Sequence, residues 1–234
     1  REQLKPLIQS VLTENKRLQE KKLAILTWGN ASAIDRDTGI VAIKPSGVEY
    51  QAMEADDITL CGLDGKPVES ALNPSSDLLT HLELYKAFDG IGGVVHTHSF
   101  HATAFAQACV PLACLGTTHA DNFYGTVPVT GIMTDEEISG DYEKNTGLKI
   151  IETFRAAGLD PMRMKAVLVA NHGPFTWGGT VEEAVENAIV LEAICEMAVL
   201  TRSLAPGVGP VSQALLDKHF LRKHGENSYY GQKT

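Results

Sequence analysis

The pattern of apolar and polar positions along this chain predicts helices and short strands that interleave from end to end. Charged and apolar residues alternate with helical spacing over 1–22, which predicts an amphipathic helix rather than a signal peptide. Short apolar runs bounded by glycine, proline or polar turns predict strands. We expect these at 23–26, 31–34, 40–44, 58–63, 66–69, 92–98, 112–115, 126–129 and 166–170.

Longer segments with helical spacing or helix-starting residues predict the remaining helices. They lie at about 74–88, 101–108, 134–158 with an interruption before 146, 180–204 and 211–223. Several neighbouring strands are joined by hairpin-like turns, such as the Asp64-Gly65 pair that suits a type I′ turn. The pattern therefore favours one α/β domain over 1–234, with a mixed, largely antiparallel sheet covered by helices on both faces.

Composition and charge narrow the class of protein. The chain has 234 residues, of which 44% are hydrophobic and 21% are charged, which excludes a disordered or collagen-like chain. No apolar run approaches the ~20 residues that cross a membrane. A net charge of −9 without a long run of Lys or Arg argues against a nucleic-acid partner. The four cysteines form no CxxC pair, so we expect reduced thiols in a cytoplasmic protein.

Candidate metal ligands stand at the ends of two predicted strands. His96 and His98 end an apolar run and, being two residues apart, point to the same face. His172 directly follows the strand at 166–170, and Asp77 stands at a predicted helix start. Three imidazoles and a carboxylate suit Zn²⁺ or a similar divalent ion, with positions left for a substrate. An isolated His-x-His pair is more often structural, so this pattern alone leaves both roles open.

Three turns carry the groups that hold an anion. Gly29-Asn30, Ser46-Gly47 and Ser75-Ser76 all lie where a strand ends or a helix begins, and such turns present free N–H groups and hydroxyls. Each is also a common turn sequence, and Lys44 is a weaker candidate for adding positive charge. Because the chain is acidic overall, an anionic substrate must be held by such local groups or by a metal ion.

Seven segments, in this order, resemble the class II aldolase/adducin family. They are Thr27-Trp28-Gly29-Asn30, Lys44-Pro45-Ser46-Gly47, Pro74-Ser75-Ser76-Asp77, His96-Thr97-His98-Ser99, Gly116-Thr117-Thr118-His119-Ala120-Asp121, Asn171-His172-Gly173-Pro174 and Tyr229-Tyr230-Gly231-Gln232. The resemblance covers nearly the whole chain. The fifth and seventh segments are more particular to the family's L-ribulose-5-phosphate 4-epimerases. The resemblance implies a three-layer α/β/α fold and a ring-shaped homotetramer.

The resemblance also implies roles for individual residues. It implies Zn²⁺, with Mn²⁺ or Co²⁺ as alternatives, bound by Asp77, His96, His98 and His172. It implies a substrate phosphate held around Gly29, Asn30, Ser46, Gly47, Ser75 and Ser76. Asp121 and Tyr230 would be the acid/base residues, with Tyr230 supplied by a neighbouring subunit. From the residues alone, Asp121 would be interpreted as a turn residue, and Tyr230 as an aromatic residue that packs the C-terminal tail against the protein.

The implied activity inverts C4 of a ketopentose phosphate and interconverts L-ribulose 5-phosphate and D-xylulose 5-phosphate. The C4 hydrogen is not acidic, but retro-aldol cleavage of C3–C4 leaves an enediolate that a metal ion stabilises. Rotation of the aldehyde before the bond re-forms inverts C4, so O4 needs acid/base groups on two sides. A fuculose-phosphate-type aldolase and a non-enzymatic adducin-like scaffold remain as alternatives. The pentose source, arabinose or ascorbate among others, is left open.

Overall fold

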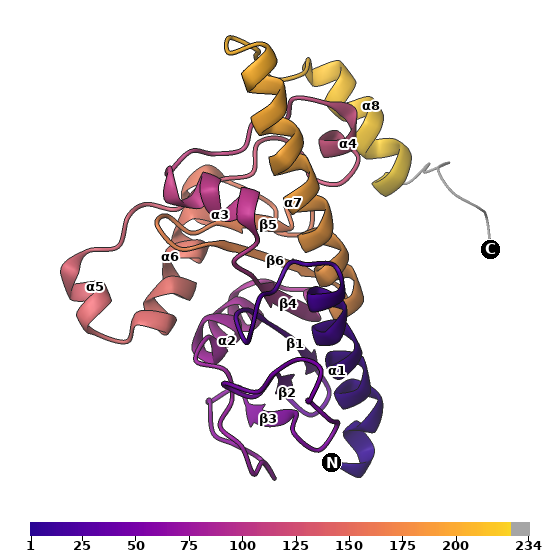
Figure 1. Ribbon diagram of the computed structural model, residues 1–234, viewed down its shortest axis with the longest axis vertical. Helices are drawn as coiled ribbons and strands as arrows, with labels where there is room; N and C mark the ends of the chain where they lie inside the picture. The colour runs from indigo at the N-terminus through magenta and orange to yellow at the C-terminus, as the bar shows by residue number, and fades with distance from the viewer. Residues whose placement is uncertain (226–234) are drawn as a thin grey trace.

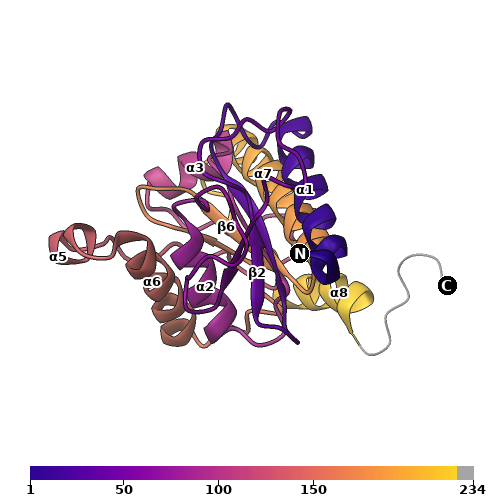
Figure 2. The ribbon, with the colours of Figure 1, turned by 90° about the horizontal axis from the view of Figure 1, so that it is seen from below.

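The computed structural model describes residues 1–225, in which a six-stranded sheet lies between layers of helices (Figures 1 and 2). The strand order is β3-β2-β1-β4-β6-β5, and each pair of neighbours is antiparallel. The strands are β1 (Asn30–Asp35), β2 (Ile40–Ile43), β3 (Thr59–Gly62), β4 (Gly93–His96), β5 (Ala166–Leu168) and β6 (Pro174–Gly178). The expected α/β class, with a largely antiparallel sheet covered on both faces, is confirmed.

Two apolar clusters hold the helices against the sheet. Helices α1 (Lys5–Glu20) and α7 (Val181–Leu204) lie on one face, and α2 (Leu78–Ala87) and α6 (Tyr142–Ala157) lie on the other (Figure 2). The first part of α7 joins the cluster of α1, whereas its later part joins the cluster of α2. Along β1, Ala31 and Ala33 join the cluster of α1, whereas Ile34 joins the cluster of α2. This alternation follows from the two-residue period of a strand.

The remaining helices surround this core. They are η1 (Glu2–Leu4), α3 (Phe100–Gln107), α4 (Thr117–Ala120), α5 (Asp135–Ser139) and α8 (Gln213–His224). Helices α4 and α8 lie together at one end of the molecule (Figure 1). None of the helices in the described range meets the length and apolarity that a bilayer crossing requires.

Sequence patterns overestimate the strands at the margins of the sheet. The segment 23–26 is a loop, and Leu26 has a φ of 55° that no strand tolerates. The segment 66–69 makes only a single bridge, between Cys61 and Pro67, because proline has no N–H to continue a ladder. Likewise, 112–115 and 126–129 meet only at the Leu112–Val127 bridge. Asp64 does not have the positive φ of a type I′ turn.

Strand β6 and helix α4 are absent from the pattern-based prediction. Strand β6 begins at Pro174, directly after the Asn171-His172-Gly173 turn, and pairs with both β4 and β5. Strand β5 directly precedes it in the sequence, but β4 lies about 80 residues earlier, so the local pattern does not indicate this central strand. Helix α4 is a single turn of four residues, too short for a helical period to show.

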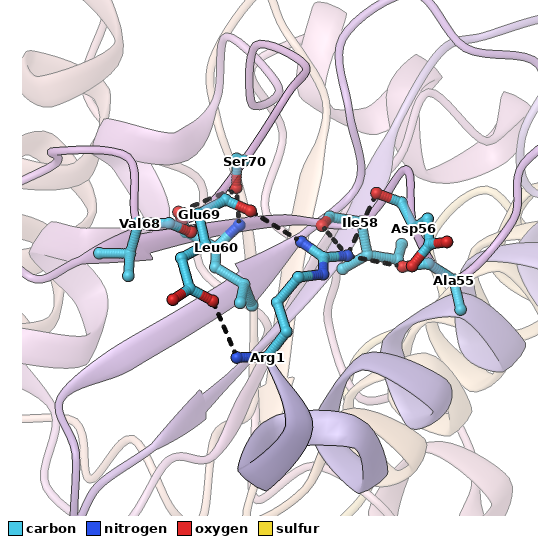
Figure 3. Close-up of polar contacts among 8 residues, drawn as sticks. All are labelled: Arg1, Ala55, Asp56, Ile58, Leu60, Val68, Glu69 and Ser70. Atoms are coloured by element: carbon cyan, nitrogen blue, oxygen red, sulfur yellow. Dashed lines mark hydrogen bonds and ion pairs between the residues drawn. The ribbon is translucent and has the colours of Figure 1, made fainter.

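The Arg1 side chain fixes the loops beside the edge strand β3. Its guanidinium donates to the carbonyl oxygens of Ala55 (2.9 Å), Asp56 (3.1 Å) and Ile58 (3.1 Å), as Figure 3 shows. It also donates to the carbonyl of Glu69 at 3.2 Å. These carbonyl groups lie outside the sheet ladders and would otherwise depend on water. The contacts join the start of the chain to the edge of the sheet.

Candidate metal and substrate site

Three neighbouring strands place side chains in one row across the sheet. The antiparallel register pairs Asn30 of β1 with His96 of β4, and His96 in turn with Phe175 of β6. The His96 and Phe175 rings stack with their centroids 4.3 Å apart and their planes 17° apart. His96 is only 1% exposed. The sheet itself therefore fixes the position of this imidazole.

Two more histidines converge on His96. His98 lies two residues beyond the end of β4, and its Nε2 is 3.0 Å from Nε2 of His96. His172 comes from the turn between β5 and β6, with its ring centroid 4.7 Å from that of His96 and 5.2 Å from that of His98. One nitrogen from each ring lies within 4.8 Å of the others. The structure thus brings together all three histidines that the sequence singled out.

This histidine triad has the chemistry of a divalent-metal site. Nδ1 of His96 donates to the carbonyl of Pro174 at 3.0 Å, which leaves Nε2 as a free lone pair. Burial and the neighbouring His96 lower the pKa of His98 to about 4. Burial, with His96 and His98, lowers the pKa of His172 to about 3. Neutral imidazoles in this arrangement are ligands for Zn²⁺ and related ions, so the residues fit a metal.

Asp77 lies at the start of α2 beside the triad, where Asn30 holds its carboxylate. The Asn30 side-chain amide donates to Oδ2 of Asp77 at 2.6 Å and to Oγ of Ser75 at 2.9 Å. Burial raises the pKa of Asp77, but His96, His81 and the Asn30 hydrogen bond together bring it below its usual value. The carboxylate is therefore ionised. Within the described range, the cluster of convergent ligand atoms comprises the three histidines and does not include Asp77.

A cleft of about 640 Å³ opens beside the triad and contains the turns predicted to hold an anion. Its lining includes 27–30, 44–47, 75–77, Tyr142 and Glu143, together with the triad. Lys44 is 2% exposed, and its Nζ donates to the carbonyls of Thr27 and Pro45, each at 3.3 Å. Burial lowers the pKa of Lys44 to about 8. Hydroxyls, turn backbone and an amine thus share one cleft with the triad.

Gly29 and Gly173 allow the backbone to pass close to these histidines. Gly29 has a φ of +76°, and a Cβ there would lie 2.8 Å from the carbonyl oxygen of His96. A Cβ on Gly173 would lie 2.8 Å from the carbonyl oxygen of Thr97. Any other residue at Gly29 would be both strained and crowded. Close packing at the triad therefore requires glycine in these two segments.

Sequence reasoning missed two residues of this region. The Tyr142 hydroxyl lies 3.4 Å from Nδ1 of His172, a contact across 30 residues that no local pattern indicates. His81 falls within the helix predicted at 74–88, where a histidine is usually capped or solvated, but the residue has no exposed surface. It lies one helical turn after Asp77, and this i, i+4 spacing is the signal that could have found it.

Asp121 lies apart from the cleft of its own chain, at the C-terminal end of α4 against α8. Its carboxylate accepts from Nε and Nη2 of Arg222, at 3.1 and 2.8 Å, and from Nδ1 of His219 at 3.0 Å. Burial raises the pKa of Asp121, but Arg222 and His219 outweigh this and lower it. Among the described residues, Asp121 does not line the cleft. Tyr230, the other predicted acid/base residue, lies outside the described range.

Comparison with known proteins supports the same grouping as the sequence motifs. A family profile described as the class II aldolase and adducin N-terminal domain matches residues 9–199. The L-ribulose-5-phosphate 4-epimerases UlaF of Salmonella paratyphi A and Salmonella typhi are each 49% identical over 230 residues, covering 98% of this chain and all of theirs. Both relatives therefore align along their whole length.

Solved structures show the same fold. An L-fuculose 1-phosphate aldolase superposes with a TM-score of 0.77 at 24% identity, covering 92% of this chain and 94% of its own. The L-fuculose-1-phosphate aldolase of Thermus thermophilus superposes with a TM-score of 0.66 at 25% identity, covering 88% and 98%. From its profile match, its relatives and its fold, the chain belongs to the class II aldolase and adducin family.

Proposed function

We propose that this chain is an L-ribulose-5-phosphate 4-epimerase, which interconverts L-ribulose 5-phosphate and D-xylulose 5-phosphate by cleaving and re-forming the C3–C4 bond. The observation that carries the proposal is the 49% identity to relatives of that name along their entire length. The cleft supports it, because a buried histidine triad shares the cleft with hydroxyl-bearing turns and a lysine. The reaction needs a metal site, for which the triad is the candidate, and a phosphate site, for which the turns and the lysine are the candidates.

We assign the metal position to His96, His98, His172 and Asp77, with Zn²⁺ as the ion. A bound divalent ion would supply Lewis-acid stabilisation of the negative charge on O2 and O3 of the substrate after cleavage. The low pKa values of His98 and His172, both caused mainly by burial, keep their lone pairs available at neutral pH. Asp77, held by Asn30 in the same cleft, contributes the negative charge of the set.

We assign the substrate phosphate to the turns at Gly29-Asn30, Ser46-Gly47 and Ser75-Ser76, with Lys44 beside them. Backbone N–H groups and hydroxyls of such turns hold a phosphate without a net positive surface. The aldehyde fragment carries this phosphate and has to turn over before the bond re-forms. An aldolase of the fuculose-phosphate type shares the phosphate site but releases the aldehyde. Retention of the fragment, together with a second acid/base residue, therefore separates an epimerase from an aldolase.

We propose that Asp121 and Tyr230 act on O4 from a neighbouring subunit of a ring-shaped homotetramer, and that the enzyme works in the cytoplasm. The position of Asp121 supports this, because the carboxylate does not reach the cleft of its own chain. A closed ring with heterologous interfaces carries one subunit's α4 and α8 to the next subunit's cleft. Tyrosine has a usual pKa of about 10, so Tyr230 would donate a proton to the re-formed alkoxide.

One assay tests this function. The purified protein, with its bound metal quantified, is incubated with L-ribulose 5-phosphate, and the products are separated. We expect D-xylulose 5-phosphate. Accumulation of free dihydroxyacetone and glycolaldehyde phosphate would instead identify an aldolase, and absence of both metal and turnover would identify a scaffold.

A further inference from the structure

Behind Asp77, a buried polar ladder joins β1 to α2. Asn30 and Ser32 are two residues apart and share one face of β1, while Asp77 and His81 are four apart and share one face of α2. The first rung joins Asn30 to Asp77 at 2.6 Å, and the second joins Oγ of Ser32 to Nδ1 of His81 at 2.7 Å. Tyr85, one turn further along α2, lies 2.8 Å from the same Ser32 oxygen.

Two atoms of this ladder are buried and have no hydrogen-bond partner within residues 1–225: Nε2 of His81 and Oδ1 of Asn30. Buried polar atoms without partners are rare in folded proteins, so each needs an explanation. Helical side chains lean toward the start of their helix, which carries the His81 ring toward the first turn of α2. Asp77 occupies that turn, and its carboxylate acts electrostatically on the ring.

The charge of Asp77 selects one tautomer of His81. Burial keeps the ring neutral, so it carries a single N–H. A proton on Nε2 is attracted by the Asp77 carboxylate, whereas a bare lone pair there would be repelled. With the proton on Nε2, Ser32 donates to Nδ1, and the Tyr85 hydroxyl donates to Ser32. These two hydrogen bonds then run in one direction, from Tyr85 through Ser32 to His81, and they leave the Nε2–H subject to the field of the carboxylate.

We propose that His81 is a positioning residue that directs a buried N–H at the Asp77 carboxylate and, together with Asn30, holds this carboxylate in the orientation that completes the metal site. The inference rests on the proposed metal role of Asp77. Groups that orient a metal ligand typically change metal affinity 10–100-fold. His81 therefore affects the metal without contacting it, through Asp77 alone.

The test is a double-mutant cycle that measures Zn²⁺ affinity by competition with a chelator, independently of turnover. We expect His81→Leu to weaken Zn²⁺ binding about 10-fold or more in the wild-type background and to have little effect when Asp77→Asn is already present. Tyr85→Phe, which spares the Ser32–His81 contact, is the matched control and should stay within about threefold. An equal loss in both backgrounds, or no loss, overturns the proposal.

A second measurement needs no variant. In the folded wild-type protein, ¹⁵N chemical shifts of the His81 ring should show the proton on Nε2, and a proton on Nδ1 would overturn the proposal. Zn²⁺ affinity and the His81 tautomer are both measured without turnover, so their results are independent of the epimerase assay. A protein that binds Zn²⁺ with this coupling but does not convert L-ribulose 5-phosphate would contradict the proposed function and leave this inference standing.

Discussion

Arg222 and Asp121 form a forked ion pair, with both oxygens of the carboxylate bonded to nitrogens of the guanidinium. His219 adds a third hydrogen bond to the same carboxylate. The pair joins the end of α4 to α8, and it lies outside the cleft that contains the histidine triad. Arg222 and His219 hold this carboxylate ionised by lowering its pKa. Under the proposed function, it acts on a substrate that is bound in the cleft of another subunit.

Asp121→Asn should lower turnover by about 10²-fold or more, the scale of general acid–base groups, while metal content stays at the wild-type level. The amide keeps the shape of the side chain but accepts no proton. The measurement is kcat with the metal content of the same sample. Asp217→Asn is the control, because Asp217 lies on α8, the helix that packs against Asp121, and accepts a hydrogen bond from Tyr124 at 2.5 Å without any assigned role. Wild-type turnover in Asp121→Asn would show that its assigned role is wrong.

His98→Asn should reduce metal affinity and turnover together, because it removes one of the three convergent imidazoles. The matched control is His101→Asn. His101 lies three residues further on, bonds Glu192 at 2.8 Å and does not belong to the triad. Metal content after dialysis and epimerase activity check both variants. A His98→Asn protein that keeps its metal and its activity would exclude the triad as the metal site.

Without metal, the protein should lose stability as the pH falls from about 6.5 toward 4. Burial lowers the pKa of His81 to about 3 and that of His119 to about 4, from an ordinary value of 6.5. Between these values the unfolded chain binds protons that the folded chain does not, so acid favours unfolding. His81 alone should contribute about 1–2 kcal/mol between pH 7 and pH 5. Urea unfolding of the metal-free protein at the two pH values measures the difference, and equal stability would contradict it.

The sequence singled out the three histidines as candidate ligands because their signals are local. His96 and His98 are two residues apart at a strand end, and His172 directly follows an apolar run. Strand period and strand ends are properties of short windows, so the pattern alone placed each imidazole at a strand end and left a metal or a structural role open. The turns around Gly29, Ser46 and Ser75 were visible for the same reason.

The remaining features depend on contacts between distant segments. Tyr142 approaches His172 only because α6 packs beside the turn before β6, and β6 forms only because β4 and β5 pair with it. His81 was not singled out by the pattern because a histidine in a helix is usually exposed, and its contact with Ser32 comes from another element. The partners of Asp121 are about 100 residues away on α8.

The strongest test of a shared active site mixes two inactive variants. If each site combines the triad of one subunit with Asp121 of the next, an equal mixture of Asp121→Asn and His98→Asn subunits contains intact sites. Random assembly in a ring makes about a quarter of the sites complete. Co-expression of the two variants under different affinity tags, followed by sequential purification, yields the hybrid tetramers for the assay.

The control mixture shows why recovery would be specific. His98→Asn and His172→Asn both damage the triad of their own chain, so no arrangement of these subunits restores a site. We expect the first mixture to regain activity far above the sum of its parts and the control mixture to remain inactive. If Asp121 serves the cleft of its own chain, every subunit in the first mixture lacks one essential group. That mixture would then be as inactive as the control, and the shared site would be refuted.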